Sequence, residues 1–262
     1  MTVRVLVLGN SDTRGEFAPG PTWVQVARER LNTGEPGYEF VERGFGPLGD
    51  TAAAFAGRLV GQHEPDLVVV PLGTFLFTVG FTWPRVRRVF GQRVADAYRR
   101  AEEAFDTRTR PSGAPPGRTN TMARRAARRI LGTRPIARRT DVEDAYGRVL
   151  QELARHENLD VLLVAYPPER GRLVKVRRIE EERAAFLQAL GGLASRRHFR
   201  LLDSAPLFAG REAEADMMTA DGFHLEREGH AILGAAVAAA IREGRPAQGQ
   251  ERGRGPSGAA RQ

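Results

Sequence analysis

Apolar residues occur along this chain in two patterns. Some form continuous runs, and others recur at the interval of a helix turn. Near-continuous apolar runs at residues 3–8, 66–72 and 159–165 predict parallel strands that are covered on both faces. Shorter apolar segments at residues 38–42 and 199–202 predict two further strands. The pattern therefore predicts a sheet of five strands.

Helical spacing fills the intervals between these strands. The predicted helices span residues 23–31, 51–63, 141–156, 176–197 and 226–242. At the start of the third helix, Thr140 and Glu143 predict a capping box. The last helix is expected to bury Leu233, Ala236, Val237, Ala240 and Ile241. Alternating strands and helices favour an α/β fold with three α/β/α layers and a doubly wound, flavodoxin-like parallel sheet.

Residues 82–139 interrupt this alternation and are predicted to form a helical insertion. One amphipathic helix is expected, with apolar residues at Val86, Val89, Phe90, Val94, Ala97, Tyr98, Ala101 and Phe105. A loop rich in proline and glycine follows at 110–117, and a second helix is predicted at 121–131. Residues 245–262 contain almost nothing apolar, so this tail is predicted to be disordered.

Positive charge is concentrated in the insertion. The chain carries a net charge of +8, but residues 85–139 alone hold 16 arginines against four acidic residues. Three interpretations stay open: a solvated face of a cap, a cap that gathers anionic or amphiphilic substrate, and a surface that binds nucleic acid or a membrane. No motif for sequence readout accompanies the arginines, so we do not expect nucleic acid as the partner.

The composition also excludes several classes of site. The chain has no cysteine, which excludes disulfides and thiolate metal sites. Its carboxylates are too scattered to predict a metal site, and nothing in the sequence predicts a cofactor. No apolar stretch approaches the roughly 20 residues of a membrane span, and the first residues lack the pattern of a secretion signal. We therefore expect a cytoplasmic protein.

Three residues with catalytic chemistry stand at opposite ends of the chain. The first strand is followed by Ser11, and Asp221 precedes His224 by three residues near the other end. Because the carboxyl ends of parallel strands meet at one edge of a sheet, we expect these residues to converge there. A serine, a histidine and a carboxylate that orients the histidine are the groups that make a hydroxyl nucleophilic near neutral pH.

These segments and their order resemble the SGNH (GDSL-type) hydrolase family. Its first block is Gly-Asp-Ser, where this chain has Asn10 before the serine, and its fifth block is Asp-x-x-His. Residues 44–51 resemble the second block and residues 161–168 the fourth.

The resemblance implies a role for each matched residue. Ser11 would be the nucleophile, His224 the general base, and Asp221 the group that orients the imidazole. The backbone N–H groups of Ser11 and Gly49 would stabilise the oxyanion.

The third block departs from the family pattern Gly-x-Asn-Asp. After Gly73 and Thr74, this chain has Phe75 where the asparagine amide would donate to the oxyanion. Loss of one such donor typically lowers turnover about a hundred- to a thousandfold. Asn120 in the insertion, or a hydroxyl of Thr74 or Thr78, are alternative donors that the sequence does not rank.

We therefore expect one SGNH-type domain over residues 1–244, followed by the tail 245–262. The expected function is that of a serine esterase or acyl hydrolase, acting on a small-molecule, lipid or carbohydrate ester with an incomplete oxyanion hole and without a cofactor or metal. The alternative is a non-catalytic SGNH-like module that binds an acylated or anionic ligand, for which Phe75 is the reason. A nucleic-acid-associated protein is the weaker rival. The sequence does not decide the substrate or the oligomeric state.

Overall fold

The five predicted strands form one parallel sheet. The computed structural model describes residues 2–15, 20–33, 37–97, 132–169, 178–211, 217–219, 222 and 224–244. The strands are β1 (Val3–Gly9), β2 (Tyr38–Gly44), β3 (Leu67–Leu72), β4 (Asp160–Ala165) and β5 (Arg200–Asp203). They are all parallel, in the order β2-β1-β3-β4-β5, which confirms the predicted α/β fold and its flavodoxin-like sheet.

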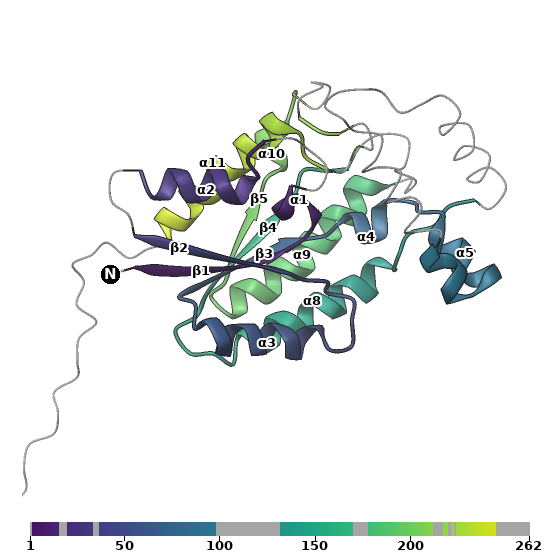
Figure 1. Ribbon diagram of the computed structural model, residues 1–262, viewed down its shortest axis with the longest axis horizontal. Helices are drawn as coiled ribbons and strands as arrows, with labels where there is room; N and C mark the ends of the chain where they lie inside the picture. Colours follow the sequence, from purple (N-terminus) through teal and green to yellow (C-terminus); the bar gives the residue numbers. More distant parts are fainter. Residues whose placement is uncertain are drawn as a thin grey trace, which may run out of the picture.

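Helices cover both faces of this sheet (Figure 1). One face carries α2 (Trp23–Leu31) and α11 (Arg227–Glu243), and the other carries α3 (Ala52–His63), α8 (Arg139–Leu153) and α9 (Ile179–Arg196). Four shorter helices also lie in the described part of the chain: α1 (Ser11–Arg14), α4 (Phe75–Thr78), α5 (Trp83–Phe90) and α10 (Ala205–Phe208). Residues 92–97 are helical as well. Within the described ranges, no helix combines the length and the apolar character that crossing a membrane requires.

Alternate residues of each strand build the two halves of the core. In β1, Leu6 and Leu8 join the cluster under α3, α8 and α9, whereas Val5 and Val7 join the cluster under α2 and α11. Helices α2 and α11 approach closely because α11 has Gly234 at their contact, where a Cβ would lie 2.7 Å from the backbone oxygen of Trp23.

The local prediction for the start of α8 is wrong, and the one for the buried side of α11 is confirmed in part. Helix α8 begins at Arg139, one residue before Thr140, so Thr140 does not cap it. The Asp141 carboxylate accepts from the Arg138 backbone N–H at 3.2 Å, and Glu143 pairs with Arg139 instead. In α11, Leu233, Val237 and Ile241 are buried as predicted. Ala240 is half-buried and packs against the core, and Ala236 is only half-buried.

The amphipathic helix predicted from Val86 onward is not continuous. Helix α5 ends at Phe90, and Gly91 follows with a φ of 81°, outside the helical region. Residues 92–97 are helical again, so two helical segments stand where one helix was predicted. The rest of that predicted helix from residue 98 on, the loop at 110–117, the helix at 121–131 and the tail at 245–262 lie outside the described residues. The domain boundaries at 1–244 and 245–262 therefore stay a prediction.

Candidate active site

Ser11 and His224 meet at the carboxyl edge of the sheet. Ser11 is the first residue of α1, directly after β1, and His224 lies just before α11. The Ser11 Oγ is 3.0 Å from the His224 Nε2, although 213 residues separate them. His224 is buried and Ser11 is half-buried, so the pair is screened from bulk water on the histidine side.

A tight turn after β1 sets the direction of Ser11. The side-chain oxygen of Asn10 accepts from the backbone N–H groups of Asp12 at 3.1 Å and of Thr13 at 3.4 Å, as an N-cap does. The Thr13 hydroxyl donates to the backbone oxygen of Asn10 at 2.8 Å. A Cβ on Gly9 would lie 2.2 Å from that hydroxyl oxygen, so the turn requires glycine before Asn10.

Asp12 ties the histidine loop to the serine turn. Its carboxylate is buried and accepts from the backbone N–H of Leu225 at 3.1 Å. Asp12 is adjacent to Ser11 and Leu225 is adjacent to His224, so this hydrogen bond sets the separation of the two reactive side chains.

Three buried aromatic and imidazole groups support the turn from below. The Tyr166 hydroxyl donates to the Asn10 side-chain oxygen at 3.2 Å and accepts from the Trp23 indole N–H at 2.9 Å. The backbone N–H of Trp23 donates to Nδ1 of His230 at 3.2 Å. Burial, and then the neighbouring His224, lower the pKa of His230 to about 4, so its ring is neutral near pH 7 and accepts that bond.

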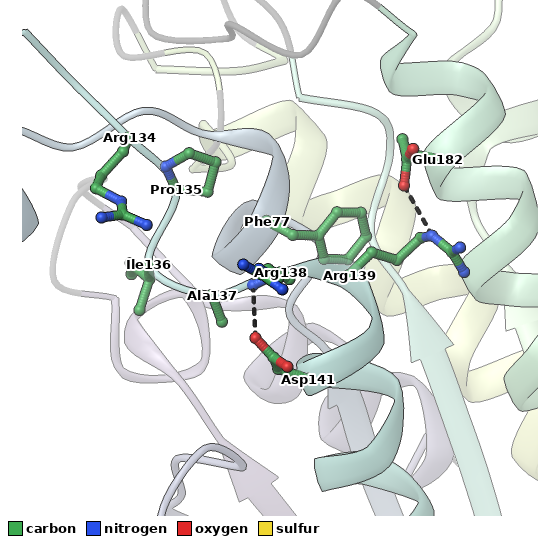
Figure 2. Close-up of a pocket in the computed structure, with 9 residues that line it drawn as sticks. All are labelled: Phe77, Arg134, Pro135, Ile136, Ala137, Arg138, Arg139, Asp141 and Glu182. Carbon is green, nitrogen blue, oxygen red and sulfur yellow. Dashed lines mark hydrogen bonds and ion pairs between the residues drawn. The ribbon is translucent and has the colours of Figure 1, made fainter.

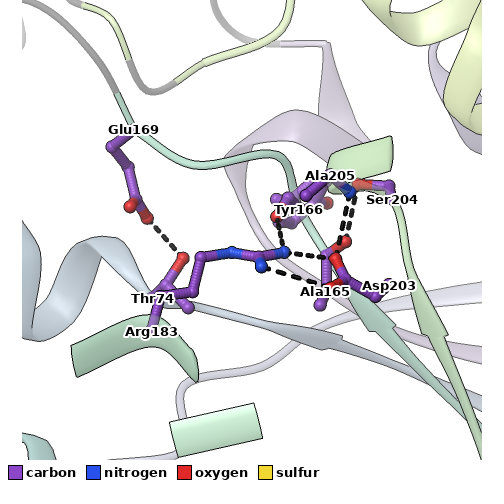
Figure 3. Close-up of polar contacts among 8 residues, drawn as sticks. All are labelled: Thr74, Ala165, Tyr166, Glu169, Arg183, Asp203, Ser204 and Ala205. Atoms are coloured by element: carbon purple, nitrogen blue, oxygen red, sulfur yellow. Dashed lines mark hydrogen bonds and ion pairs between the residues drawn. The ribbon is translucent and has the colours of Figure 1, made fainter. Parts of the chain in front are cut away.

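The third-block segment is held by side chains that the sequence did not single out. The Gly73 backbone N–H donates to the Tyr146 hydroxyl at 2.8 Å. The Thr74 hydroxyl donates to the buried carboxylate of Glu169, as Figure 3 shows, and the Thr78 hydroxyl donates to the Thr74 backbone oxygen at 3.0 Å. Burial raises the pKa of Glu169, and the hydrogen bond from Thr74 opposes that rise.

Beside this segment, Arg183 of α9 links the ends of β4 and β5 (Figure 3). The buried Arg183 guanidinium donates to the backbone oxygen of Tyr166 at 2.9 Å and pairs with the Asp203 carboxylate. Burial alone would raise the pKa of Asp203, but the hydrogen bonds from Arg183 and from the Ala205 N–H lower it. This pair therefore fixes the strand end from which Tyr166 reaches Asn10.

The structure describes some of the remaining predicted site residues and not others. Gly49 is exposed in the turn after β2, and the adjoining loop is joined to the β1 end by a 2.8 Å bond from the Phe45 N–H to the Gly9 oxygen. Phe75 is half-buried, and its ring lies 3.0 Å from where a Cβ on Gly73 would stand. Asp221 and Asn120 lie outside the described residues. Among the residues that are described, no cluster of histidine and carboxylate side chains could hold a metal.

A pocket of about 270 Å³ lies away from this pair, between α4 and the first turns of α8 and α9 (Figure 2). Arg134, Arg138 and Arg139 line it together with Phe77, Pro135, Ile136, Ala137, Asp141 and Glu182. Its carboxylates are engaged, because Glu182 accepts from Arg139 at 2.7 Å and Asp141 from the Arg138 backbone. None of the predicted catalytic residues lines it.

Comparison with known proteins places this arrangement in a family. The sequence model of the GDSL-like lipase/acylhydrolase family matches residues 7–232, which include Ser11 and His224. The chain belongs to this family. A search of curated proteins gives no match.

Solved structures share the fold of this GDSL-like protein. An acetyl xylan esterase, AlAXEase, superposes with a TM-score of 0.54 at 18% identity, covering 91% of this chain and 100% of the other. An acetylxylan esterase from Geobacillus stearothermophilus gives 0.56 at 14% identity, covering 92% and 95%. A lipase/acylhydrolase from Enterococcus faecalis gives 0.51 at 13% identity, covering 92% and 96%. Three structures of the Geobacillus enzyme are of catalytic mutants, one of an aspartate, one of a histidine three residues later and one of a serine.

The Asp12 contact predicts a positioning role that a substitution series can measure. In Asp12→Ala, the Leu225 N–H loses its acceptor and the His224 loop is free to shift, so kcat for a short-chain ester should fall about a hundredfold with little change in KM. Asp12→Asn keeps an oxygen at the same place and should retain most of the activity. Equal losses in the two variants would contradict this role, because they would show that the charge matters and not the hydrogen bond.

The lowered pKa of His230 predicts a loss of stability in acid. The unfolded chain takes up a proton on this histidine near pH 6.5, whereas the folded protein does so only near pH 4. The stabilisation is therefore complete above pH 6.5 and is lost as the pH falls toward 4, by up to about 3 kcal/mol. His230→Asn places an oxygen near the Nδ1 position without a titrating ring, so its unfolding free energy should change less over this range. Denaturant unfolding between pH 7 and 4 would measure the difference, and parallel curves would contradict it.

Proposed function

We propose that this GDSL-like protein is a serine esterase or acyl hydrolase that cleaves a carboxylic ester. The observation that carries the proposal is the 3.0 Å separation of Ser11 Oγ and His224 Nε2, the arrangement of a nucleophile and its base. The Geobacillus enzyme, whose catalytic mutants alter a serine and an Asp-x-x-His pair, supports the same roles here, because Asp221 precedes His224 by the same interval.

In the proposed reaction, His224 takes the hydroxyl proton of Ser11 while Oγ attacks the ester carbonyl. The tetrahedral intermediate collapses by breaking the bond to the alcohol, and His224 returns the proton to that leaving oxygen. A water molecule then attacks the acyl-serine by the same route and releases the acid. Asp221 is assigned the second imidazole nitrogen, where it holds the tautomer and offsets the charge that develops.

Two backbone donors are assigned to the oxyanion. Within the described part of the chain, the N–H groups of Ser11 and Gly49 have no acceptor, so both are available to a substrate. The Gly73 N–H and the Thr74 hydroxyl are directed to Tyr146 and Glu169 instead. We therefore assign Gly73 and Thr74 to the wall of the site.

The third donor remains open in this proposal. The Thr78 hydroxyl is directed to the backbone, and Phe75 carries no donor, which leaves Asn120 as the sequence candidate. The ring of Phe75 against Gly73 is also the observation that favours the second candidate function, a non-catalytic module that binds an acylated or anionic ligand.

Substitution of the reactive pair tests the hydrolase assignment. The wild-type protein should hydrolyse p-nitrophenyl acetate and should be labelled by a fluorophosphonate, because activated short-chain esters demand least of an incomplete oxyanion hole. Ser11→Ala and His224→Ala should each lower kcat at least about ten-thousandfold, since triad members act as a unit. Labelling should disappear in Ser11→Ala.

Matched substitutions control for effects on the fold. Ser195→Ala changes an exposed serine of α9 and His156→Ala a half-buried histidine after α8, and both should leave hydrolysis unchanged. A folded wild type that neither turns over a panel of acetyl and butyryl esters nor reacts with the fluorophosphonate would favour the binding module.

Restoring the family's amide tests the oxyanion assignment. In Phe75→Asn, a third donor should raise kcat by up to about a hundredfold. Phe75→Leu is the control, because it removes the ring without adding a donor and should not raise kcat. If both variants gain equally, the ring obstructs the site, and if neither gains while the fold is intact, another group already supplies the donor.

A further inference from the structure

The apolar side of α5 continues beyond the protein core. Pro84 and Val86 of this helix are buried, whereas Val89 is 63% exposed and Phe90 57% exposed. Val94, beyond the break at Gly91, is 48% exposed. In Figure 1, α5 lies at the periphery of the molecule, away from the sheet. Large apolar side chains that share an exposed patch indicate an interaction surface.

Arginines border this apolar side. At 100° per residue, Val86, Val89 and Phe90 fall on one side of α5, with Arg85 and Arg87 on its two flanks. Arg85, Arg87, Arg88 and Arg93 are all exposed. In the described part of the chain, none of the four forms an ion pair. The Arg87 guanidinium lies 5.7 Å from the centre of the Trp83 ring.

This combination favours an anionic lipid surface over other polyanions. The phosphates of nucleic acid could contact the arginines. The outer surface of nucleic acid is phosphate and sugar, however, so it gives the exposed valines no apolar partner. A bilayer interface takes up apolar side chains at the acyl boundary while the flanking arginines reach the headgroups. The four exposed arginines of residues 85–93 add attraction to a negatively charged membrane.

We propose that residues 83–94 dock this protein on anionic lipid bilayers, with Val89, Phe90 and Val94 entering the interface and the surrounding arginines contacting the headgroups. The helix is eight residues long and lies on the membrane without spanning it. Docking does not depend on the proposed esterase activity, so each can fail without the other.

Vesicle binding by the full chain tests the proposal. Vesicles of ether-linked phosphatidylcholine, with or without 25% ether-linked phosphatidylglycerol, exclude any effect of lipid hydrolysis. The protein should sediment with the anionic vesicles at least tenfold more than with the neutral ones at 0.1 M salt, and 0.5 M salt should weaken this binding. Brominated lipids should quench Trp83, while Trp23, which is fully buried, provides a constant background.

Variants separate the apolar contribution from the charge. Val89→Gln with Phe90→Gln should lower the partition coefficient at least tenfold, while Leu207→Gln, at an exposed leucine of α10, should not. Arg85→Gln with Arg87→Gln, which removes the two flanking charges, should lower binding to the anionic vesicles about tenfold. Arg43→Gln with Arg197→Gln removes the same charge at exposed positions elsewhere and should change binding by less than twofold.

Four outcomes would overturn the proposal. The first is equal sedimentation with neutral and anionic vesicles, and the second is binding that the Val89 and Phe90 substitutions leave unchanged. The third is dimerisation that those substitutions abolish without any vesicle binding, which would make a second copy the occupant. The fourth is a large drop in thermal stability of the Val89→Gln, Phe90→Gln variant together with no vesicle binding by the wild type, which would show that the chain itself covers this face.

Discussion

The turn that carries Ser11 depends on the side-chain oxygen of Asn10. It accepts hydrogen bonds from the backbone of Asp12 and Thr13 and from the hydroxyl of Tyr166. The first two satisfy donors that the start of a helix leaves unpaired, and the third attaches the turn to the end of β4. A helix of four residues has almost no stability of its own, so these contacts determine where the Ser11 hydroxyl points.

The same contacts couple the candidate site to the core. The Tyr166 hydroxyl is also the acceptor for the buried indole of Trp23, whose backbone N–H is satisfied by His230 on α11. A buried donor without a partner costs about 1–3 kcal/mol. Each side chain in this series of hydrogen bonds is therefore held in place by its bond to the next one. On the opposite side, Asp12 joins the turn to Leu225. Ser11 and His224 are thereby attached to the same two helices, α2 and α11, that cover one face of the sheet.

Periodicity and topology were enough to predict much of this arrangement. Spacing located all five strands within about two residues, and the parallel order brought Ser11 and His224 to one edge. Contacts between specific side chains were not predictable, because nothing local in the sequence says that Glu169 receives the hydroxyl of Thr74 or that Tyr166 reaches Asn10. Those pairings depend on loop paths that many segments fix together. Gly91 is the sequence signal for the break after α5. The prediction of one longer helix followed the apolar repeat, which continues past this glycine.

Asparagine at position 10, where the family usually has aspartate, follows from the charges around it. Asp12 is a buried carboxylate two residues away. Burial, and then the charge of Asp12, raise the pKa of Tyr166 well above its ordinary value, so the phenol keeps its proton and donates it to the oxygen of Asn10. A carboxylate at position 10 would accept the same three hydrogen bonds, but it would add a second negative charge next to Asp12 in a site that water reaches poorly. The amide supplies the capping oxygen without that charge, while the Asp12 carboxylate accepts from the backbone N–H of Leu225.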